Sequence, residues 1–382
     1  MQLVAYGAQD VYLTGNPQIT FFKVVYRRHT NFACEAIEQT FNGTPSFGSK
    51  ATVQITRNGD LVTKMWLHTT LTVTGTVALR KWPGYALINS VELQIGGTKI
   101  DKHYGQWMAI WADLTVTDSK LVAHDALVGT EDGTATEEIF VPLQFFCCRN
   151  DGLALPLIAL QYHDVRLEFD FASQTVVNSN ATQDATNKIT MTNTSLLVNY
   201  VYLDSEERKR FAQASHEYLI EQLQHTGAES GIAASATKKF RLNFNHPVKE
   251  LVWVQKVDTR TDISNVGTQT ELDENTPIGS ALLQLNGHDR FSVQNEKFFS
   301  KLQPYTHHTA SPSNGVNVYS FALNPEEHQP SGTCNFSRID NATLSITNGT
   351  TQTDTNGTVF IYAVNYNVLR IMSGMGGVAY SN

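Results

Sequence analysis

The sequence has few charged residues and few cysteines. Asp, Glu, Lys and Arg make up 17% of its 382 residues, whereas an average soluble domain has about 25%. The cysteines are too few and too irregularly placed for a disulfide framework, so a reducing compartment is expected. They are Cys34, Cys147, Cys148 and Cys334. The length favours two domains, because a domain usually has roughly 100 to 200 residues.

Long apolar runs are absent as well. The longest, Leu153 to Leu160, is interrupted by Pro156 and is far shorter than the ~20 residues that a membrane-spanning helix requires. The first residues do not place an apolar segment after a basic one, so we expect no secretory signal. The sequence therefore predicts no membrane-spanning helix and a protein that stays where it is made.

Basic residues do not exceed acidic ones. Lys and Arg total 28 against 36 for Asp and Glu, which gives a formal net charge of -8. Binding to a nucleic-acid backbone depends mainly on Lys and Arg contacts to phosphate groups. We therefore expect no direct nucleic-acid binding.

The motifs of common enzymes are missing. There is no Walker-type glycine loop, no H-E-x-x-H and no G-x-S-x-G. The glycines of Gly374 to Gly377 lie too near the C-terminus for a dinucleotide-binding helix to follow, so a flexible turn is expected there. We expect no enzyme, no metal site and no cofactor, because the remaining reactive groups lack a third partner at a suitable spacing. We interpret these groups as turn or rim residues (His124-Asp125, His163-Asp164), surface histidines (His307-His308) and a buried strand end (Cys147-Cys148-Arg149).

What the chain does have is threonine, asparagine and aromatic residues in short alternating runs. Threonine and aromatic side chains suit a pleated strand, and asparagine suits turns. Asn58-Gly59 predicts a tight hairpin after the first of these runs. Many short strands separated by turns indicate an all-β sandwich or barrel. The expected strands are Ala51–Thr56, Leu61–Val73, Ala86–Ile95, Glu138–Phe146, Leu153–Leu160, Val165–Phe171 and Ser195–Leu203.

Two helices interrupt this pattern. Apolar residues from Tyr104 to Leu114 recur at helical spacing on one face. A second helix is expected to start at Asp204 or Ser205, either of which can cap it. Long polar stretches are expected to be surface loops. They are Thr117–Glu137, Ala172–Thr194, Asp258–Pro277 and Thr347–Gly357.

The two halves of the chain resemble each other. The segment SVELQIGG from Ser90 is repeated as SALLQLNG from Ser280, 190 residues later. In the same order, VTKMWLHTTL from Val62 matches VKELVWVQKV from Val248 in pattern. A repeat of this length is too long for a solenoid and suits a duplicated domain of about eight strands. An antiparallel domain of that size is typically a jelly roll, and Leu93 and Leu283 are expected in the two cores.

The chain carries N-x-S/T sequons that would be glycosylated only along a secretory route. In a sequence so rich in threonine and asparagine, we attribute most of them to chance. As candidate glycosylation sites they are Asn42, Asn180, Asn193, Asn335, Asn341, Asn348 and Asn356.

Several long strings carry a specific resemblance. They are GAQDVYLTGNPQITFFKVVYRRHTNF from Gly7, RNGDL from Arg57, YVYLDSEERKRFAQ from Tyr200, HEYLIEQLQ from His216 and NYNVLRIMSGMGGVAYSN from Asn365. Together they resemble the major capsid proteins of nucleocytoplasmic large DNA viruses, of the algal and amoebal giant-virus type. The resemblance covers nearly the whole chain.

This resemblance implies a double jelly roll, with two eight-stranded antiparallel sandwiches and short inserted helices. It implies a homotrimer that forms a pseudo-hexagonal capsomer in an icosahedral shell, next to other capsomers and minor capsid proteins and above an internal membrane. The protein would be part of the virion, assembled in the host cytoplasm. The implied divisions are an arm at 1–31, a first jelly roll at 32–203, a connector helix at 204–215 and a second jelly roll at 216–382.

The resemblance implies no catalytic residues, so the candidate site is a docking arm. An aromatic and Arg-rich arm matches the composition of protein interfaces, although the same aromatics could instead cap the first sandwich. The candidate arm contacts are Tyr12, Phe21, Phe22, Tyr26, Arg27 and Arg28.

Three alternatives share the fold. One is a jelly-roll module for glycan binding or host attachment, and another is a minor capsid paralogue. The third is a metal-dependent double cupin, which the lack of an H-x-H pair disfavours.

Overall fold

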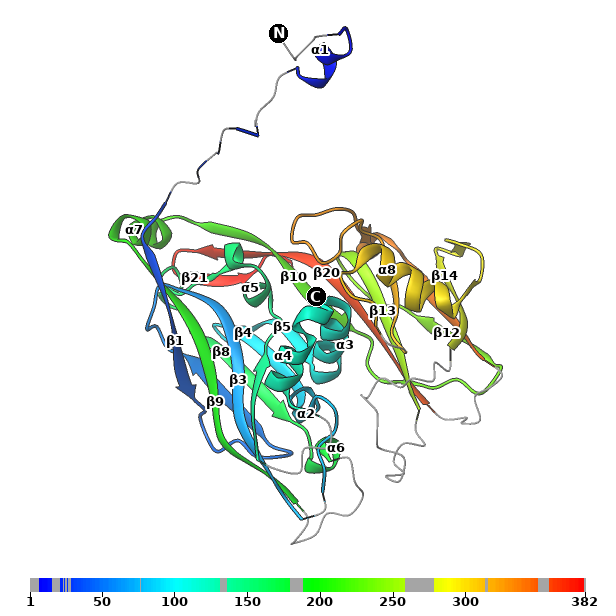
Figure 1. Ribbon diagram of the computed structural model, residues 1–382, viewed down its shortest axis with the longest axis horizontal. Helices are drawn as coiled ribbons and strands as arrows, with labels where there is room; N and C mark the ends of the chain where they lie inside the picture. Colours follow the sequence, from blue (N-terminus) through cyan, green and yellow to red (C-terminus); the bar gives the residue numbers. More distant parts are fainter. Residues whose placement is uncertain are drawn as a thin grey trace, which may run out of the picture.

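Four antiparallel sheets form the framework of the protein in a computed structural model (Figure 1). The structure describes residues 7–15, 21–22, 24, 26, 29–75, 77–130, 136–178, 188–257, 278–312, 315–349 and 357–380.

The first two sheets form one sandwich, which we call the first sandwich. One sheet has the strand order β1-β9-β3-β6, with β7 paired to β3, and the other has the order β2-β8-β4-β5. The bounds are β1 (Phe32–Thr40), β2 (Lys50–Ile55), β3 (Leu61–Thr74), β4 (Ile88–Ile95), β5 (Thr98–Tyr104), β6 (Glu137–Pro142), β7 (Leu155–Pro156), β8 (Val165–Phe171) and β9 (Lys188–Leu203).

The second sandwich repeats this topology strand for strand. Its sheets have the orders β10-β20-β13-β17 and β12-β19-β14-β15, with shorter strands added at the edges. The bounds are β10 (His216–His225), β11 (Glu229–Ser230), β12 (Thr237–Arg241), β13 (Pro247–Val257), β14 (Ile278–Leu285), β15 (His288–Asp289), β16 (Gln294–Asn295), β17 (Asn317–Ser320), β18 (Cys334–Asn335), β19 (Ala342–Asn348), β20 (Gly357–Met372) and β21 (Met375–Val378). The predicted all-β fold is confirmed: the two sheets of each antiparallel sandwich have four main strands each, which gives the expected eight strands, and the short strands β7, β11, β16, β18 and β21 are additional.

The repeat extends to the hairpin turns. Gly96 and Gly97 join β4 to β5 with φ of 58° and 80°, and Asn286 and Gly287 join β14 to β15 with φ of 53° and 78°. A two-residue hairpin turn of this hand needs positive φ at both positions, which glycine and asparagine adopt at low cost. The repeated sequence pairs therefore make the same turn in both sandwiches.

Alternation places one side of each strand in a core. In β8 every second residue from Val165 to Phe171 is buried, as period-two patterning requires. Leu93 and Leu283, at equivalent positions of the repeat, are 0% and 1% exposed, which confirms their expected core positions. The first core also includes Ile220 and Leu369 from strands of the second sandwich.

The helices fall mainly between strands. Both predicted helices are confirmed, as α3 and α7. The α-helices are α1 (Asp10–Leu13), α2 (Pro83–Leu87), α3 (Gly105–Thr115), α4 (Asp118–Val128), α5 (Phe146–Arg149), α6 (Gln174–Val177), α7 (Ser205–Gln213) and α8 (Gln303–His307). Single turns of other helix types are η1 (Asp151–Leu153), η4 (Phe298–Leu302, a π-helix) and η5 (Phe336–Arg338).

Some local predictions were wrong or only partly right. The expected loop at Thr117–Glu137 contains α4, whose buried His124 and Val128 lie four residues apart on one helix face. Leu153–Leu160 contains only the two-residue strand β7 between turns, consistent with Pro156 lacking a backbone donor. Asn58-Gly59 closes no hairpin, because β2 and β3 belong to different sheets. Gly374 lies in the predicted turn, which joins β20 to β21, whereas Gly376 and Gly377 belong to the strand β21.

The other expected loops are described only in part. Ala172–Thr194 contains α6 and the start of β9, which begins at Lys188. Asp258–Pro277 and most of Thr347–Gly357 lie outside the described residues.

Candidate functional site

The two sandwiches meet at an apolar junction built around α3. This helix follows β5 of the first sandwich, and one face of it lies on the outer surface of the sheet β10-β20-β13-β17 of the second sandwich (Figure 1). Burial of this much apolar surface favours a rigid pair of sandwiches. The helix contributes Trp107, Ile110, Trp111 and Leu114, and the second sandwich contributes Val252, Val254, Val318, Tyr362 and Val364 from the sheet and Val316 from just before β17.

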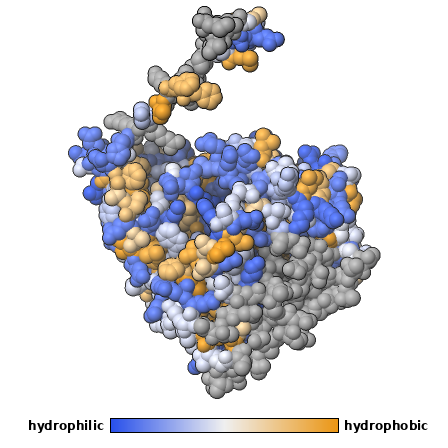
Figure 2. Space-filling model, in the orientation of Figure 1, coloured by the Kyte–Doolittle hydropathy of each residue, from blue (hydrophilic) through white to orange (hydrophobic). Residues whose placement is uncertain are grey.

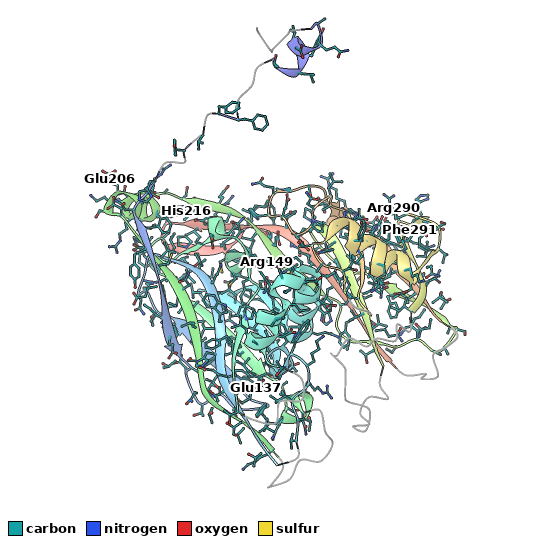
Figure 3. The ribbon with its side chains drawn as sticks, viewed as in Figure 1. Glu137, Arg149, Glu206, His216, Arg290 and Phe291 are labelled. Carbon is teal, nitrogen blue, oxygen red and sulfur yellow. The ribbon has the colours of Figure 1, made fainter. Side chains whose placement is uncertain are left out.

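Charged residues complete this junction. Arg149, at the end of α5, lies between the two sandwiches (Figure 3) and donates from Nη1 to Oε2 of Glu221 on β10 over 3.0 Å. The other carboxylate oxygen of Glu221 lies 2.6 Å from Nζ of Lys249, whose side chain is fully buried. The Arg149 guanidinium also lies 3.9 Å from the centre of the Trp111 ring, a cation–π contact. One arginine thus contacts both the polar and the apolar parts of the junction.

A second buried ion pair continues the network. Nε2 of His308 lies 3.0 Å from Oε2 of Glu250, and Nδ1 lies 2.9 Å from Oε1 of Glu326. Burial by itself lowers the pKa of His308, but the adjacent Glu250 carboxylate, assisted by Glu326, raises it to about 9. The pKa of Glu250 is lowered, because the attraction of His308 and Lys249 outweighs its burial. The pair is therefore charged at neutral pH.

The connector helix α7 is fixed to the first sandwich through Asp60. Asp204 caps the helix by accepting from the Ser205 amide. Asp60 accepts from the Leu203 amide at 2.8 Å and pairs with Nε of Arg208 at 2.9 Å. Beside α7 lies a groove of about 520 Å³. Its lining residues are Leu61, Asp151, Gly152, Ala154, Glu207, Arg210, Phe211, Ala214, His216 and Tyr218.

The candidate arm extends away from both sandwiches (Figure 1). The side chains of Tyr12 and Tyr26 are 90% and 86% exposed, and Phe21 and Phe22 are completely exposed. They do not cap the first sandwich, which leaves apolar side chains open on the arm, orange in Figure 2. Arg27 and Arg28 lie outside the described residues.

The sequons differ in accessibility. Asn348 is 3% exposed, and its Nδ2 donates to the Ile232 carbonyl at 2.7 Å. As a candidate glycosylation site it was wrong, because a buried amide with a structural hydrogen bond is not available for modification. Asn180 and Asn356 lie outside the described residues. The exposed ones are Asn42, Asn193, Asn335 and Asn341.

The reactive groups of the sequence are mostly structural. His308 is not a surface histidine, since its side chain is fully buried. His124 is not a rim residue but accepts or donates a hydrogen bond with the Tyr85 hydroxyl at 3.0 Å inside the protein. Cys147 is buried on the helix α5 rather than at a strand end. His163 is partly exposed and contacts the Gly376 backbone.

Neither a metal cluster nor a membrane span is found in the described ranges. No group of at least three His, Cys, Asp or Glu side chains there could hold a metal ion. No helix among these residues is long and apolar enough to cross a membrane. The features that stand out are instead the junction, the arm and the connector.

Two protein-family models match the two halves of the chain. The model described as "Major capsid protein N-terminus" matches residues 20–204, and that described as "Large eukaryotic DNA virus major capsid protein" matches residues 207–377. The major capsid protein of Pyramimonas orientalis virus is 52% identical over 100% of this chain and 99% of its own length. That of Paramecium bursaria Chlorella virus 1 is 46% identical with the same coverage.

Solved structures of capsid proteins are similar to this chain as well. VP54 of Paramecium bursaria Chlorella virus 1, fitted into a reconstruction of the Sputnik virophage, has a TM-score of 0.84 and 41% identity, covering 95% of this chain and all of that one. The Faustovirus major capsid protein, at 14% identity and a TM-score of 0.77, shares the double jelly-roll fold. The chain belongs to the major capsid proteins of the large eukaryotic DNA viruses, which form the capsid of the virion.

Proposed function

We propose that three copies of this protein form a pseudo-hexagonal capsomer that tiles an icosahedral shell. The observation that carries this proposal is the duplicated topology, in which two sandwiches with the same strand order are joined by a buried junction. Most oligomers have closed symmetry, and three copies of such a chain present six similar domains. A relative of 46% identity comes from a virus whose capsid has been described as a quasi-atomic model, which supports a lattice of neighbouring capsomers.

The divisions of the chain follow from this role. Residues 1–31 act as an arm, 32–203 and 216–382 as the two jelly rolls, and 204–215 as the connector between them. The exposed Tyr12, Phe21, Phe22 and Tyr26 of the arm dock, together with Arg27 and Arg28, on minor capsid proteins or neighbouring capsomers near an internal membrane. Unpartnered aromatic side chains beside arginines support this use, because both residue types are enriched in interfaces.

The proposed role is structural and needs neither catalysis nor a cofactor. The buried ionisable groups serve the junction: Arg149 and Lys249 each pair with Glu221, and His308 pairs with both Glu250 and Glu326. Assembly takes place in the host cytoplasm, which is consistent with four free cysteines.

Electron microscopy of the purified protein tests this proposal. We expect particles with threefold symmetry and six lobes, one for each sandwich. Particles with two lobes only, at every concentration used, would contradict the trimeric capsomer.

A further inference from the structure

The sheet face that α3 covers in the second sandwich has an equivalent face in the first sandwich, and that face is exposed. By the repeat, Trp66 of β3 corresponds to Val252 of β13. Trp66 pairs with Leu197 of β9 and Pro142 of β6, as Val252 pairs with Tyr362 of β20 and Val318 of β17. The outer face of the sheet β1-β9-β3-β6 therefore corresponds to the face that α3 covers in the second sandwich.

This open face, which we call the β3 face, has the composition of an interface. Trp66, Phe140 and Leu197 are all partly exposed, and His68 stacks on Phe140 with ring centres 4.5 Å apart. Aromatic and aliphatic side chains in such a cluster are typical of the centre of a protein contact. In Figure 2 apolar side chains are interspersed with polar ones over β1, β9 and β3.

The counterpart of α3 also has an exposed outer side. The segment η4–α8 follows β16 in the second sandwich and packs its inner side on the core through Phe299, whose ring centre lies 5.1 Å from that of Trp253. Its outer side exposes Leu302 and Tyr305, which are 51% and 84% exposed. In α3 the outward residues, such as Trp107, are instead buried against the second sandwich.

The two open surfaces lie at opposite ends of the molecule. Figure 1 has β1, β9 and β3 at one end and α8 at the other, with α3 between them. Phe291, which contacts Phe299 in η4 at 5.6 Å between ring centres, marks the α8 end in Figure 3. A contact that uses both surfaces therefore cannot form within one chain and needs a second copy.

Charge supports the same pairing. Glu38 and Glu138 flank His68 on the β3 face, with side chains 64% and 62% exposed. At η4, Lys297 and Lys301 are exposed, and the Lys301 ammonium also donates to the Pro312 carbonyl. Opposite charges at the rim favour one orientation of the contact and disfavour like-with-like pairing.

We propose that η4–α8 of one copy, through Leu302 and Tyr305, docks on the β3 face of a second copy and so repeats the α3 junction between chains. The contact is head-to-tail, and a head-to-tail contact closes into a ring if its rotation permits. This inference rests on the proposed trimer and assigns the surfaces that hold it together.

Mixing two variants tests the assignment. The double variant Leu302→Asp, Tyr305→Asp disrupts the apolar surface of η4–α8 but keeps the β3 face. The variant Leu197→Asp disrupts the β3 face but keeps the surface of η4–α8. Each variant alone is expected to be a monomer by sedimentation, because no intact pair of surfaces remains. Their equimolar mixture retains one intact pair and is expected to give a 1:1 dimer that does not grow to a trimer.

Controls separate misfolding from lost docking. Val122→Asp, at an exposed valine of α4 outside both surfaces, is expected to keep the wild-type mass. Glu38→Lys with Glu138→Lys changes only exposed side chains and is expected to weaken trimers at least tenfold, even if Leu197→Asp fails to fold. The docking would be contradicted if the Leu302→Asp, Tyr305→Asp variant and the folded variants of the β3 face kept the wild-type mass. It would also be contradicted if the equimolar mixture stayed monomeric. Neither result would contradict a trimer of the wild type. A monomeric wild type would overturn the proposed capsomer itself.

Discussion

Arg149 of the first sandwich and Glu221 of the second are joined by a hydrogen bond of 3.0 Å from Nη1 to Oε2. The Arg149 and Glu221 side chains are only 17% and 9% exposed. Glu221 in turn contacts the fully buried Lys249. The connection between the two halves of the chain therefore depends on ion pairs largely removed from water.

Arg149→Ala should destabilise the protein strongly. The substitution removes the hydrogen bond to Glu221 and the cation–π contact with Trp111, whereas Glu221 keeps its ion pair with Lys249. A hydrogen bond to a charged group contributes about 1.5–3 kcal/mol. Chemical denaturation measures the loss. Arg370→Ala is the matched control, because its pair with Glu217 is about half exposed and such pairs contribute about 1 kcal/mol or less. Equal effects of the two substitutions would contradict the importance of the junction.

Stability should fall as the pH rises from 6.5 towards 9. The ordinary pKa of a histidine is 6.5, and Glu250 and Glu326 raise that of folded His308 to about 9. The folded state therefore holds a proton that the unfolded state releases, so the stabilisation is complete below pH 6.5 and is lost as the pH passes about 9. The melting temperature of the wild type should fall more steeply over this pH range than that of the His308→Gln variant. If the melting temperatures of the two proteins changed equally with pH, His308 would not be the source of the pH dependence.

A charge in either core should unfold the corresponding sandwich. Leu93 and Leu283 are 0% and 1% exposed, and an unpaired buried charge costs several kcal/mol. Calorimetry of Leu93→Asp and Leu283→Asp should show the loss of a transition. Leu323→Asp, at a leucine that is 72% exposed, should melt like the wild type. Unchanged melting of the core variants would place the repeat positions at the surface.

Removing residues 1–31 should leave folding intact and reduce assembly. The described aromatics of this arm are exposed rather than packed on the first sandwich, so their loss removes no core contact. Circular dichroism should show an unchanged melting temperature, while light scattering should show fewer assembled particles. An unfolded truncated protein would mean that the arm belongs to the core.

Much of the fold could be predicted because it depends on local patterns. Alternation in segments such as Val165–Phe171 and the repeated turns at Gly96-Gly97 and Asn286-Gly287 indicate strands and a duplication. The helix α4 was missed because its apolar residues are spread around the helix instead of gathering on one face, and Leu121, Val122 and Leu127 are exposed. Its buried His124 is held by Tyr85, 39 residues earlier in the chain.

The candidate site was harder to predict, because its partners are distant in sequence. His308 looked like a surface residue, yet it is buried by Glu250 and Glu326. No spacing rule connects positions that only the packing of β13 against the loops of the second sandwich brings together. The junction residue Trp107 was assigned to a helix face, but the sheet that it covers could not be read from the sequence.

The mass of the purified protein in solution tests the central claim most directly. The chain has a mass of 42.4 kDa, and light scattering after size exclusion should give three times this value. A stable monomer at high concentration would contradict the capsomer account.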